Sequence, residues 1–269
     1  MRLVSCGLLI GLVAAPAWAT DYAGGDLQVV SFFDLGRPQN LGTPAVGLDY
    51  SNVTNFLGLA SAHGGAENQA GNIITRLLAD DITPASGGTG VTQMKFSVAN
   101  LNDVAVSARA RVRFWFADGA GGGPGTYYNV PAAVGFTFNA ISFGPGVTVL
   151  TATLDPNTFT LPNGTFWAGL TFDNNGGATG ATLDQMNNLG QGIFNPPTVG
   201  SSADVAFLTT AAGSFFPTNN PAGSLFTLPA DPNMPNLATN YGWEFTTIPE
   251  PATLAGLMVA GLGLFLRRR

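Results

Sequence analysis

Carboxylates are the residues of this chain best suited to acid–base chemistry. Hydrolysis of a glycosidic bond needs only two of them at a suitable separation. The acids that fall in expected turns are Asp103, Asp118, Asp155, Asp173, Asp184, Asp204 and Asp231. An aspartate at a turn usually accepts a hydrogen bond from its own backbone, so a structural role competes with a catalytic one. A polysaccharide-degrading hydrolase is therefore one alternative, and the sequence does not show which acids would converge.

The sequence gives little support for hydrolysis by a nucleophilic side chain or by a zinc ion. The chain has one histidine, His63 in SAHGGAEN, and no G-x-S-x-G pattern. A histidine in a glycine-rich turn indicates an exposed loop residue rather than a general base. A zinc site would have to combine it with carboxylates alone, which zinc sites rarely do. We therefore expect no catalytic residues and a protein that is not an enzyme.

A hard cation is the metal that the loops suit best. The stretches 155–157, 173–175 and 231–233 each place aspartate and asparagine oxygens close together, as calcium requires. Asp173 and Asn175 are the candidate ligands of a structural calcium ion, although no stretch matches the EF-hand pattern. We expect no other cofactor.

Two surfaces are candidates for ligand binding. In TFWAGLTF the alternation places Trp167 on the face opposite the apolar residues, where its ring would suit a sugar. Arg109, Arg111 and Arg113 share one face of another strand and would attract an anionic polysaccharide. Two structural alternatives stand beside these expectations: the tryptophan packs under a loop, and the arginines pair with acids.

The elements that must position these residues are β-strands. Strict alternation across VAVSARARVRFWFA, residues 104–117, predicts a strand with one face toward a core and the other in water. Turn-forming stretches such as FGPG, DPN, LPNG and DNNGG separate the other candidates. Those candidates are residues 27–33, 91–98, 134–143, 147–154, 165–172, 205–209 and 241–247.

This pattern predicts an all-β protein: a two-sheet antiparallel β-sandwich, jelly-roll-like or alternatively immunoglobulin-like. Residues 70–80 are the one place where a short helix is expected in the body. Residues 173–240 are richer in glycine, asparagine and proline, and their structure is left open.

The charge balance excludes one class of partner. Residues 20–248 hold six basic and fifteen acidic side chains, a net charge of about −9. Such a body is repelled by phosphate backbones, so nucleic acid is not an expected partner.

The N-terminal segment predicts export. Residues 1–19 combine Arg2, an apolar run and the small residues Ala17 and Ala19 around Trp18, which is typical of a signal peptide cut after Ala19 by signal peptidase. The only cysteine, Cys6, falls within it, so the mature chain would hold neither a disulfide nor a thiolate metal site.

The C-terminal segment predicts a temporary membrane contact. Residues 252–266 are almost wholly apolar and would form roughly 22 Å of helix at about 1.5 Å per residue, short for a core about 30 Å thick. Arg267, Arg268 and Arg269 would stay in the cytoplasm and stop translocation. The preceding Pro249-Glu250-Pro251 cannot continue a helix and would be accessible to a protease.

This order of tripeptide, short apolar helix and arginine cluster resembles the PEP-CTERM sorting signal. The resemblance implies an exosortase that processes the tail at the inner membrane, and delivery to the cell surface or exopolysaccharide matrix of a Gram-negative bacterium. It covers residues 248–269 and implies nothing about residues 20–247.

The sequence thus favours a signal peptide, a β-sandwich domain over residues 20–247 and a sorting segment. The expected function is a non-catalytic structural or adhesive role in the matrix. The alternatives are a carbohydrate-binding module and, third, a polysaccharide-degrading hydrolase.

Overall fold

The computed structural model describes residues 22–40, 47–128, 135–212, 218–235 and 237–248. The predicted signal peptide with Ala17 and Ala19, the tripeptide 249–251 and the arginines 267–269 lie outside the described residues. In the described part, no helix is both long enough and apolar enough to span a membrane.

Ten strands form the first sheet within the described ranges. They are β1 (Tyr22–Ala23), β6 (Glu67–Gln69), β7 (Asn72–Ile74), β8 (Arg76–Ile82), β10 (Val106–Phe116), β11 (Phe136–Thr137), β12 (Ile141–Phe143), β14 (Phe166–Asp173), β16 (Ala206–Ala212) and β17 (Gly223–Phe226). The order across the sheet is β1-β11-β10-β14-β8-β16-β17, with β12 beside β10, and β7 beside β14 and β6.

Eight strands form the second sheet in the same part of the chain. They are β2 (Gln28–Phe33), β3 (Gln39–Asn40), β4 (Leu48–Ser51), β5 (Asn55–Ala62), β9 (Val91–Asn100), β13 (Gly146–Thr153), β15 (Leu189–Phe194) and β18 (Trp243–Thr247). The order is β2-β13-β9-β15-β5-β3, and β18 lies between β9 and β4. Two short helical segments complete the described elements, the 3-10 turn η1 (Ala120–Gly122) and α1 (Leu183–Asn187).

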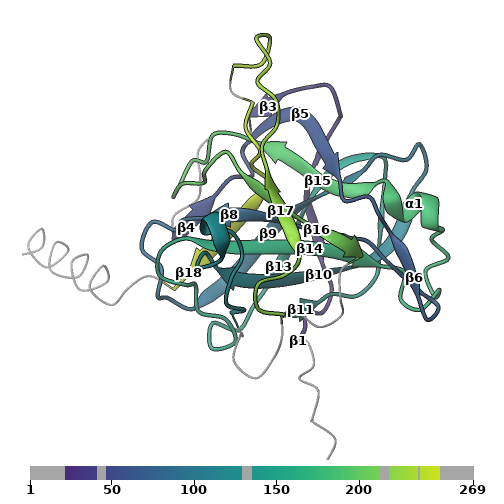
Figure 1. The fold of residues 1–269 in the computed structure, drawn as a ribbon, viewed down its shortest axis with the longest axis horizontal. Coiled ribbons are helices and arrows are strands. Elements are labelled where there is room, and N and C mark those ends of the chain that lie inside the picture. Colours follow the sequence, from purple (N-terminus) through teal and green to yellow (C-terminus); the bar gives the residue numbers. More distant parts are fainter. Residues whose placement is uncertain (1–21, 41–46, 129–134, 213–217, 236, 249–269) are drawn as a thin grey trace, which may run out of the picture.

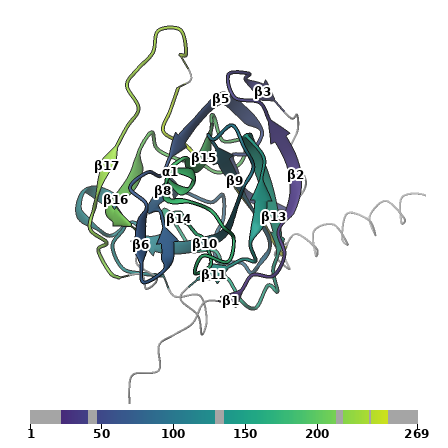
Figure 2. The ribbon, with the colours of Figure 1, turned by 90° about the vertical axis from the view of Figure 1, so that its right-hand side faces the viewer.

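Both sheets are curled and antiparallel, apart from the short parallel pair of β1 and β11 (Figures 1 and 2). Figure 2 shows them facing each other, with β2 and β13 on one side and β16 and β17 on the other. The prediction of an all-β chain with two antiparallel sheets is confirmed.

One large core fills the space between the sheets. It takes alternate residues of β14, namely Phe166, Ala168, Leu170 and Phe172, together with Phe96 and Leu150 of the facing sheet. These are the positions that alternation assigns to the inner face, because neighbouring side chains of a strand point to opposite faces.

Each sheet also carries a smaller apolar cluster on its outer face. On the first sheet this outer cluster consists of Leu77, Ala79, Trp115, Trp167 and Phe207. On the second it centres on Phe33, Phe56 and Phe194, whose rings lie 5.0 to 5.4 Å apart. Segments that cover these outer clusters bury faces that a simple sandwich would leave in water.

Two expectations about the elements need correction, and one open stretch can be described. The helix expected over residues 70–80 is wrong, because that stretch forms β7 and most of β8. Residues 134–143 hold the two separate strands β11 and β12 rather than one. In the described part of residues 173–240, whose structure was left open above, the chain forms α1, β15, β16 and β17.

Candidate functional site

The arginine face of β10 is an ion-pair site rather than an open cationic surface. Arg109 lies opposite Asp173 of β14. Its Nε and Nη2 atoms lie 2.8 and 2.7 Å from Oδ1 of Asp173, while Nε of Arg111 contacts Oδ2. Asp173 is fully buried, so its charge is balanced by two guanidinium groups instead of water.

Arg113, the third arginine, is 2 % exposed and donates through Nη1 to the carbonyl oxygens of Val112 and Phe136. Arg111 is buried as well, so the prediction that this face of β10 is wet is wrong. The alternative that the arginines pair with acids holds for Arg109 and Arg111.

Asp173, one of the two candidate calcium ligands, has other partners. The Asp173 carboxylate holds two arginines and accepts a hydrogen bond from the backbone N–H of Asn175, at 2.8 Å. Asp155 and Asp231 each accept the backbone N–H two residues ahead, as turn aspartates do. Across the described ranges, no three histidine, cysteine, aspartate or glutamate side chains gather closely enough to hold a metal ion.

Trp167 packs under a loop. It belongs to the outer cluster of the first sheet, is 1 % exposed, and donates from Nε1 to the carbonyl oxygen of Gly122 in η1, at 2.9 Å. Trp115 beside it donates to the carbonyl oxygen of Thr218 at 3.0 Å. The glycine-rich connection after β10 thus contacts Trp167, and the segment between β16 and β17 contacts Trp115. Both rings are buried, so neither offers a flat face to a sugar.

His63 is buried, contrary to the expectation of an exposed loop residue. Its Nδ1 lies 3.1 Å from the carbonyl oxygen of Arg76, so Nδ1 carries the proton and donates it. The ring packs on Phe172, with centroids 5.1 Å apart. Burial lowers the pKa of the imidazole to about 3, which keeps it neutral at physiological pH.

Two adjacent acids of β8, Asp80 and Asp81, are also buried, and sequence reasoning did not single them out. Asp80 accepts a hydrogen bond from the backbone N–H of Tyr241 at 2.7 Å, and Asp81 accepts one from that of Ala203 at 2.9 Å. Burial, and next the charge of Asp81, raises the pKa of the Asp80 carboxyl well above its usual range. Burial raises the pKa of Asp81 as well.

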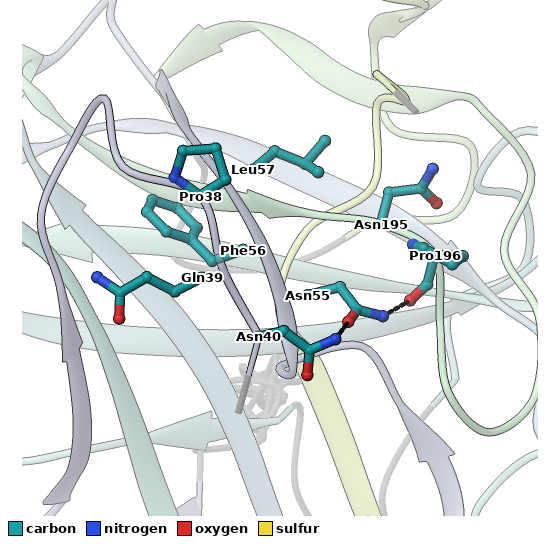
Figure 3. Close-up of a pocket in the computed structure, with 8 residues that line it drawn as sticks. All are labelled: Pro38, Gln39, Asn40, Asn55, Phe56, Leu57, Asn195 and Pro196. Atoms are coloured by element: carbon teal, nitrogen blue, oxygen red, sulfur yellow. Dashed lines mark hydrogen bonds between the residues drawn. The ribbon is translucent and has the colours of Figure 1, made fainter. Parts of the chain in front are cut away.

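A groove of about 530 Å³ with a polar lining lies on the second sheet. Figure 3 shows its lining, to which β3, β5 and the segment after β15 contribute. The residues that line this amide groove are Pro38, Gln39, Asn40, Asn55, Phe56, Leu57, Asn195 and Pro196. Four of them carry side-chain amides, and none carries a charge.

Hydrogen bonds fix the shape of the amide groove. Asn40 donates to Oδ1 of Asn55 at 2.8 Å, and Asn55 donates to the carbonyl oxygen of Pro196 at 2.7 Å, so Asn55 ties both sides together (Figure 3). Phe56, buried beneath, belongs to the outer cluster of the second sheet with Phe33 and Phe194. These packed aromatic rings form a rigid support beneath the amide side chains.

A second, smaller hollow of about 300 Å³ lies beside the loop that covers Trp167. Asn220 supplies its one polar side chain, and the rest of its lining is Ala120, Gly123, Pro124, Phe207, Pro221, Gly223 and Leu225. Neither hollow is lined by a carboxylate, so neither offers the acid pair that glycosidic hydrolysis needs.

The amide groove was missed because its residues resemble turn formers. Asparagine and proline close together, as in RPQN and FNPP, indicate a turn. The only sign in the sequence was that these two stretches, far apart in the chain, both combine proline with a side-chain amide, and strand order decides whether such stretches meet.

Comparisons of the chain with known protein families, with curated proteins and with solved structures found no match. The geometry of the amide groove is therefore the basis for any functional assignment to the body.

Proposed function

We propose that this chain is an exported, non-catalytic matrix protein that binds an uncharged polysaccharide in the amide groove. The observation that carries the proposal is the groove lining: four side-chain amides and two prolines on an aromatic support, without any ionisable group. Amides donate and accept hydrogen bonds at once, as the hydroxyl groups of a sugar do.

Charge selects against an acidic polymer. The body carries a net charge of about −9, and the arginines that would have attracted an anionic polysaccharide are occupied by Asp173 or buried. An uncharged chain escapes this repulsion. The proposal thus keeps the sugar-binding role considered for the body and moves it from Trp167 and the arginines to Asn40, Asn55 and Asn195.

The route to the matrix rests on the terminal segments. Signal peptidase would cut after Ala19, and the C-terminal helix would hold the chain in the inner membrane until an exosortase processes it near Pro249-Glu250-Pro251. A jelly-roll-like topology of the sandwich remains part of the same proposal.

Binding is tested with the soluble body, residues 20–248, and uncharged polysaccharide purified from the matrix of the native cells. Asn55→Ala removes the amide that ties Asn40 to Pro196 and fixes the shape of the groove. We therefore expect retention to weaken about tenfold, which corresponds to about 1.4 kcal/mol of binding free energy. Affinity electrophoresis in gels that contain the polysaccharide measures this change.

The matched control is Asn233→Ala, which removes an exposed turn asparagine outside the groove and should leave retention unchanged. Equal retention of the native body and the Asn55→Ala variant would overturn the assignment of the groove. Melting curves of both variants show whether each is folded.

A further inference from the structure

The sequence contains the dipeptide Asn-Gly twice, at Asn163-Gly164 and at Asn175-Gly176. Asparagine followed by glycine readily loses its side-chain amide without an enzyme, because glycine carries no side chain to obstruct the approach of its own backbone nitrogen. Both asparagines and both glycines are exposed. Exposure therefore does not distinguish the two dipeptides, whereas their hydrogen bonds do.

The reaction takes place within the chain and consumes only water. The backbone nitrogen of the glycine loses its proton to hydroxide and attacks Cγ of the preceding asparagine. A bond from this nitrogen to Cγ forms, the bond from Cγ to Nδ2 breaks, and ammonia leaves with a proton from water, which restores the hydroxide. Water then opens the cyclic succinimide at either carbonyl and leaves aspartate or isoaspartate. One neutral amide thus becomes one carboxylate.

Asn163 and Gly164 lie in the loop between β13 and β14, where the reacting atoms are free. Among the described residues, none accepts a hydrogen bond from the N–H of Gly164, and none forms a hydrogen bond with the side chain of Asn163. That side chain lies beside Gly87 and Gly88. The nitrogen of Gly164 can therefore lose its proton and turn toward Cγ without first breaking a hydrogen bond.

The same loop tolerates the product of the reaction. In the part of the chain that the structure describes, neither Asn163 nor Gly164 takes part in a backbone hydrogen bond, and β14 begins only at Phe166. Isoaspartate adds one methylene group to the main chain, and a segment outside the strand ladders can accommodate it. Conversion at Asn163 should therefore leave both sheets intact.

Asn175 lies in the turn after β14, where the corresponding atoms are held. The N–H of Gly176 donates to Oδ1 of Asn72 at 2.8 Å. The N–H of Asn175 donates to Oδ1 of the buried Asp173, also at 2.8 Å, and its carbonyl oxygen accepts from the N–H of Ala178 at 3.1 Å. The nitrogen that would attack thus has its proton engaged, and the backbone around it is fixed.

We propose that Asn163 is a site of spontaneous deamidation, which adds a carboxylate to the surface as the protein ages, and that Asn72 protects the same dipeptide at Asn175. The reaction requires neither an enzyme nor the binding of a polysaccharide, so it is independent of the proposed function. In a long-lived matrix protein the fraction converted at Asn163 would increase with the age of the molecule.

The test is peptide mapping by mass spectrometry of the protein purified from its native cells and incubated in mildly alkaline buffer. Alkali accelerates the reaction because the attacking nitrogen must be deprotonated. We expect Asn163 to convert about two- to tenfold faster than Asn175, the weight of one hydrogen bond in the activation free energy. Each conversion adds one negative charge, so ion-exchange chromatography follows the same change in the intact protein.

Unfolding should remove the difference between the two sites. In guanidinium chloride the local hydrogen bonds are lost, so both dipeptides should convert at similar rates. If Asn163 converts faster than Asn175 by the same factor in the folded and the unfolded chain, the flanking sequence rather than the structure sets the difference, and the proposal is overturned. Equal rates in the folded protein, or no conversion at Asn163, would overturn it as well.

Two substitutions of Asn72 test the protection directly. Asn72→Ala removes the acceptor of the Gly176 N–H, so conversion at Asn175 should become about two- to tenfold faster while Asn163 keeps its rate. Asn72→Asp is the matched control, because it keeps an acceptor oxygen for the same N–H and should leave Asn175 protected. An unchanged rate at Asn175 in a folded Asn72→Ala variant would refute the role of Asn72. Melting curves show whether each variant is folded, and the comparison of the two sites in the native protein needs no variant.

Discussion

At the residue scale, the stability of the fold depends on the buried carboxylate of Asp173, which lies between Arg109 and Arg111. Removing one partner from a buried ion pair leaves the other charges without compensation, which commonly costs about 3–5 kcal/mol. Because Arg109 keeps partial contact with solvent, we expect Asp173→Asn to lower the free energy of unfolding by about 3 kcal/mol. Urea unfolding of the body measures the change.

The control for Asp173→Asn is Asp155→Asn, which alters an exposed turn aspartate that accepts the N–H of Asn157. It should cost less than about 1 kcal/mol. If the two variants lose the same stability, the ion pairs of Asp173 with Arg109 and Arg111 contribute no more than an ordinary turn hydrogen bond.

His63 gives the fold a defined pH dependence. Its pKa falls from 6.5 in the unfolded chain to about 3 in the fold, so below pH 6.5 the unfolded chain binds the additional proton. The contribution of His63 to the free energy of unfolding is therefore fully present above about pH 7 and is lost as the pH falls toward 3. Between about pH 7.5 and 5 the loss should be about 2 kcal/mol.

His63→Asn isolates this contribution, because asparagine keeps a donor for the carbonyl oxygen of Arg76 but does not titrate. The variant should be less stable at neutral pH, since it lacks the ring that packs on Phe172. Its stability should fall less steeply with acid than that of the native body. Parallel slopes in the two urea series would show that His63 is not the titrating group.

At the element scale, β15 depends on close backbone approach. It lies between β9 and β5, and a Cβ atom added at Gly190 would lie 1.9 Å from the carbonyl oxygen of Ser61. We expect Gly190→Ala to destabilise the body by about 2–3 kcal/mol, because the strands must separate to admit the methyl group. Thermal unfolding monitored by circular dichroism checks this.

Gly144→Ala is the matched control, since nothing lies within 4 Å of the Cβ position there. Its effect should stay within about 0.5 kcal/mol. Similar melting temperatures for Gly190→Ala and the native body would mean that β5 and β15 are farther apart than described.

Whether a strand could be predicted from the sequence depends on whether one or both of its faces are buried. β10 and β14 alternate cleanly, and their inner positions were predictable. β8 was not, because Leu77 belongs to the outer cluster and Leu78 to the central core, so apolar residues fill both faces and no period of two remains. β15, with Gly190 and Gly192, resembles a loop because its glycines serve close packing.

The candidate site was less predictable than the fold. Alternation placed Arg109, Arg111 and Trp167 on the correct face, but it does not report that the outer face is covered. The amide groove requires residues from β3, β5 and the turn after β15 to meet, and strand order, which is a long-range property, decides that meeting.

At the scale of the whole molecule, delivery and binding are separate claims. Export and sorting predict that the protein recovered from its native cells lacks residues 1–19 and the segment after the tripeptide 249–251. Intact mass spectrometry measures both ends at once. A mass that includes Arg267, Arg268 and Arg269 would contradict processing of the C-terminal segment.

Binding rests on the architecture of the second sheet, where an aromatic cluster supports uncharged amides on the outer face. The most direct measurement is an NMR titration of the labelled body with uncharged oligosaccharides released from the native matrix. Our account predicts that the side-chain amides of Gln39, Asn40, Asn55 and Asn195 shift together and saturate. Saturating shifts confined to the surroundings of Trp167 or Arg109, or no shifts at all, would contradict it.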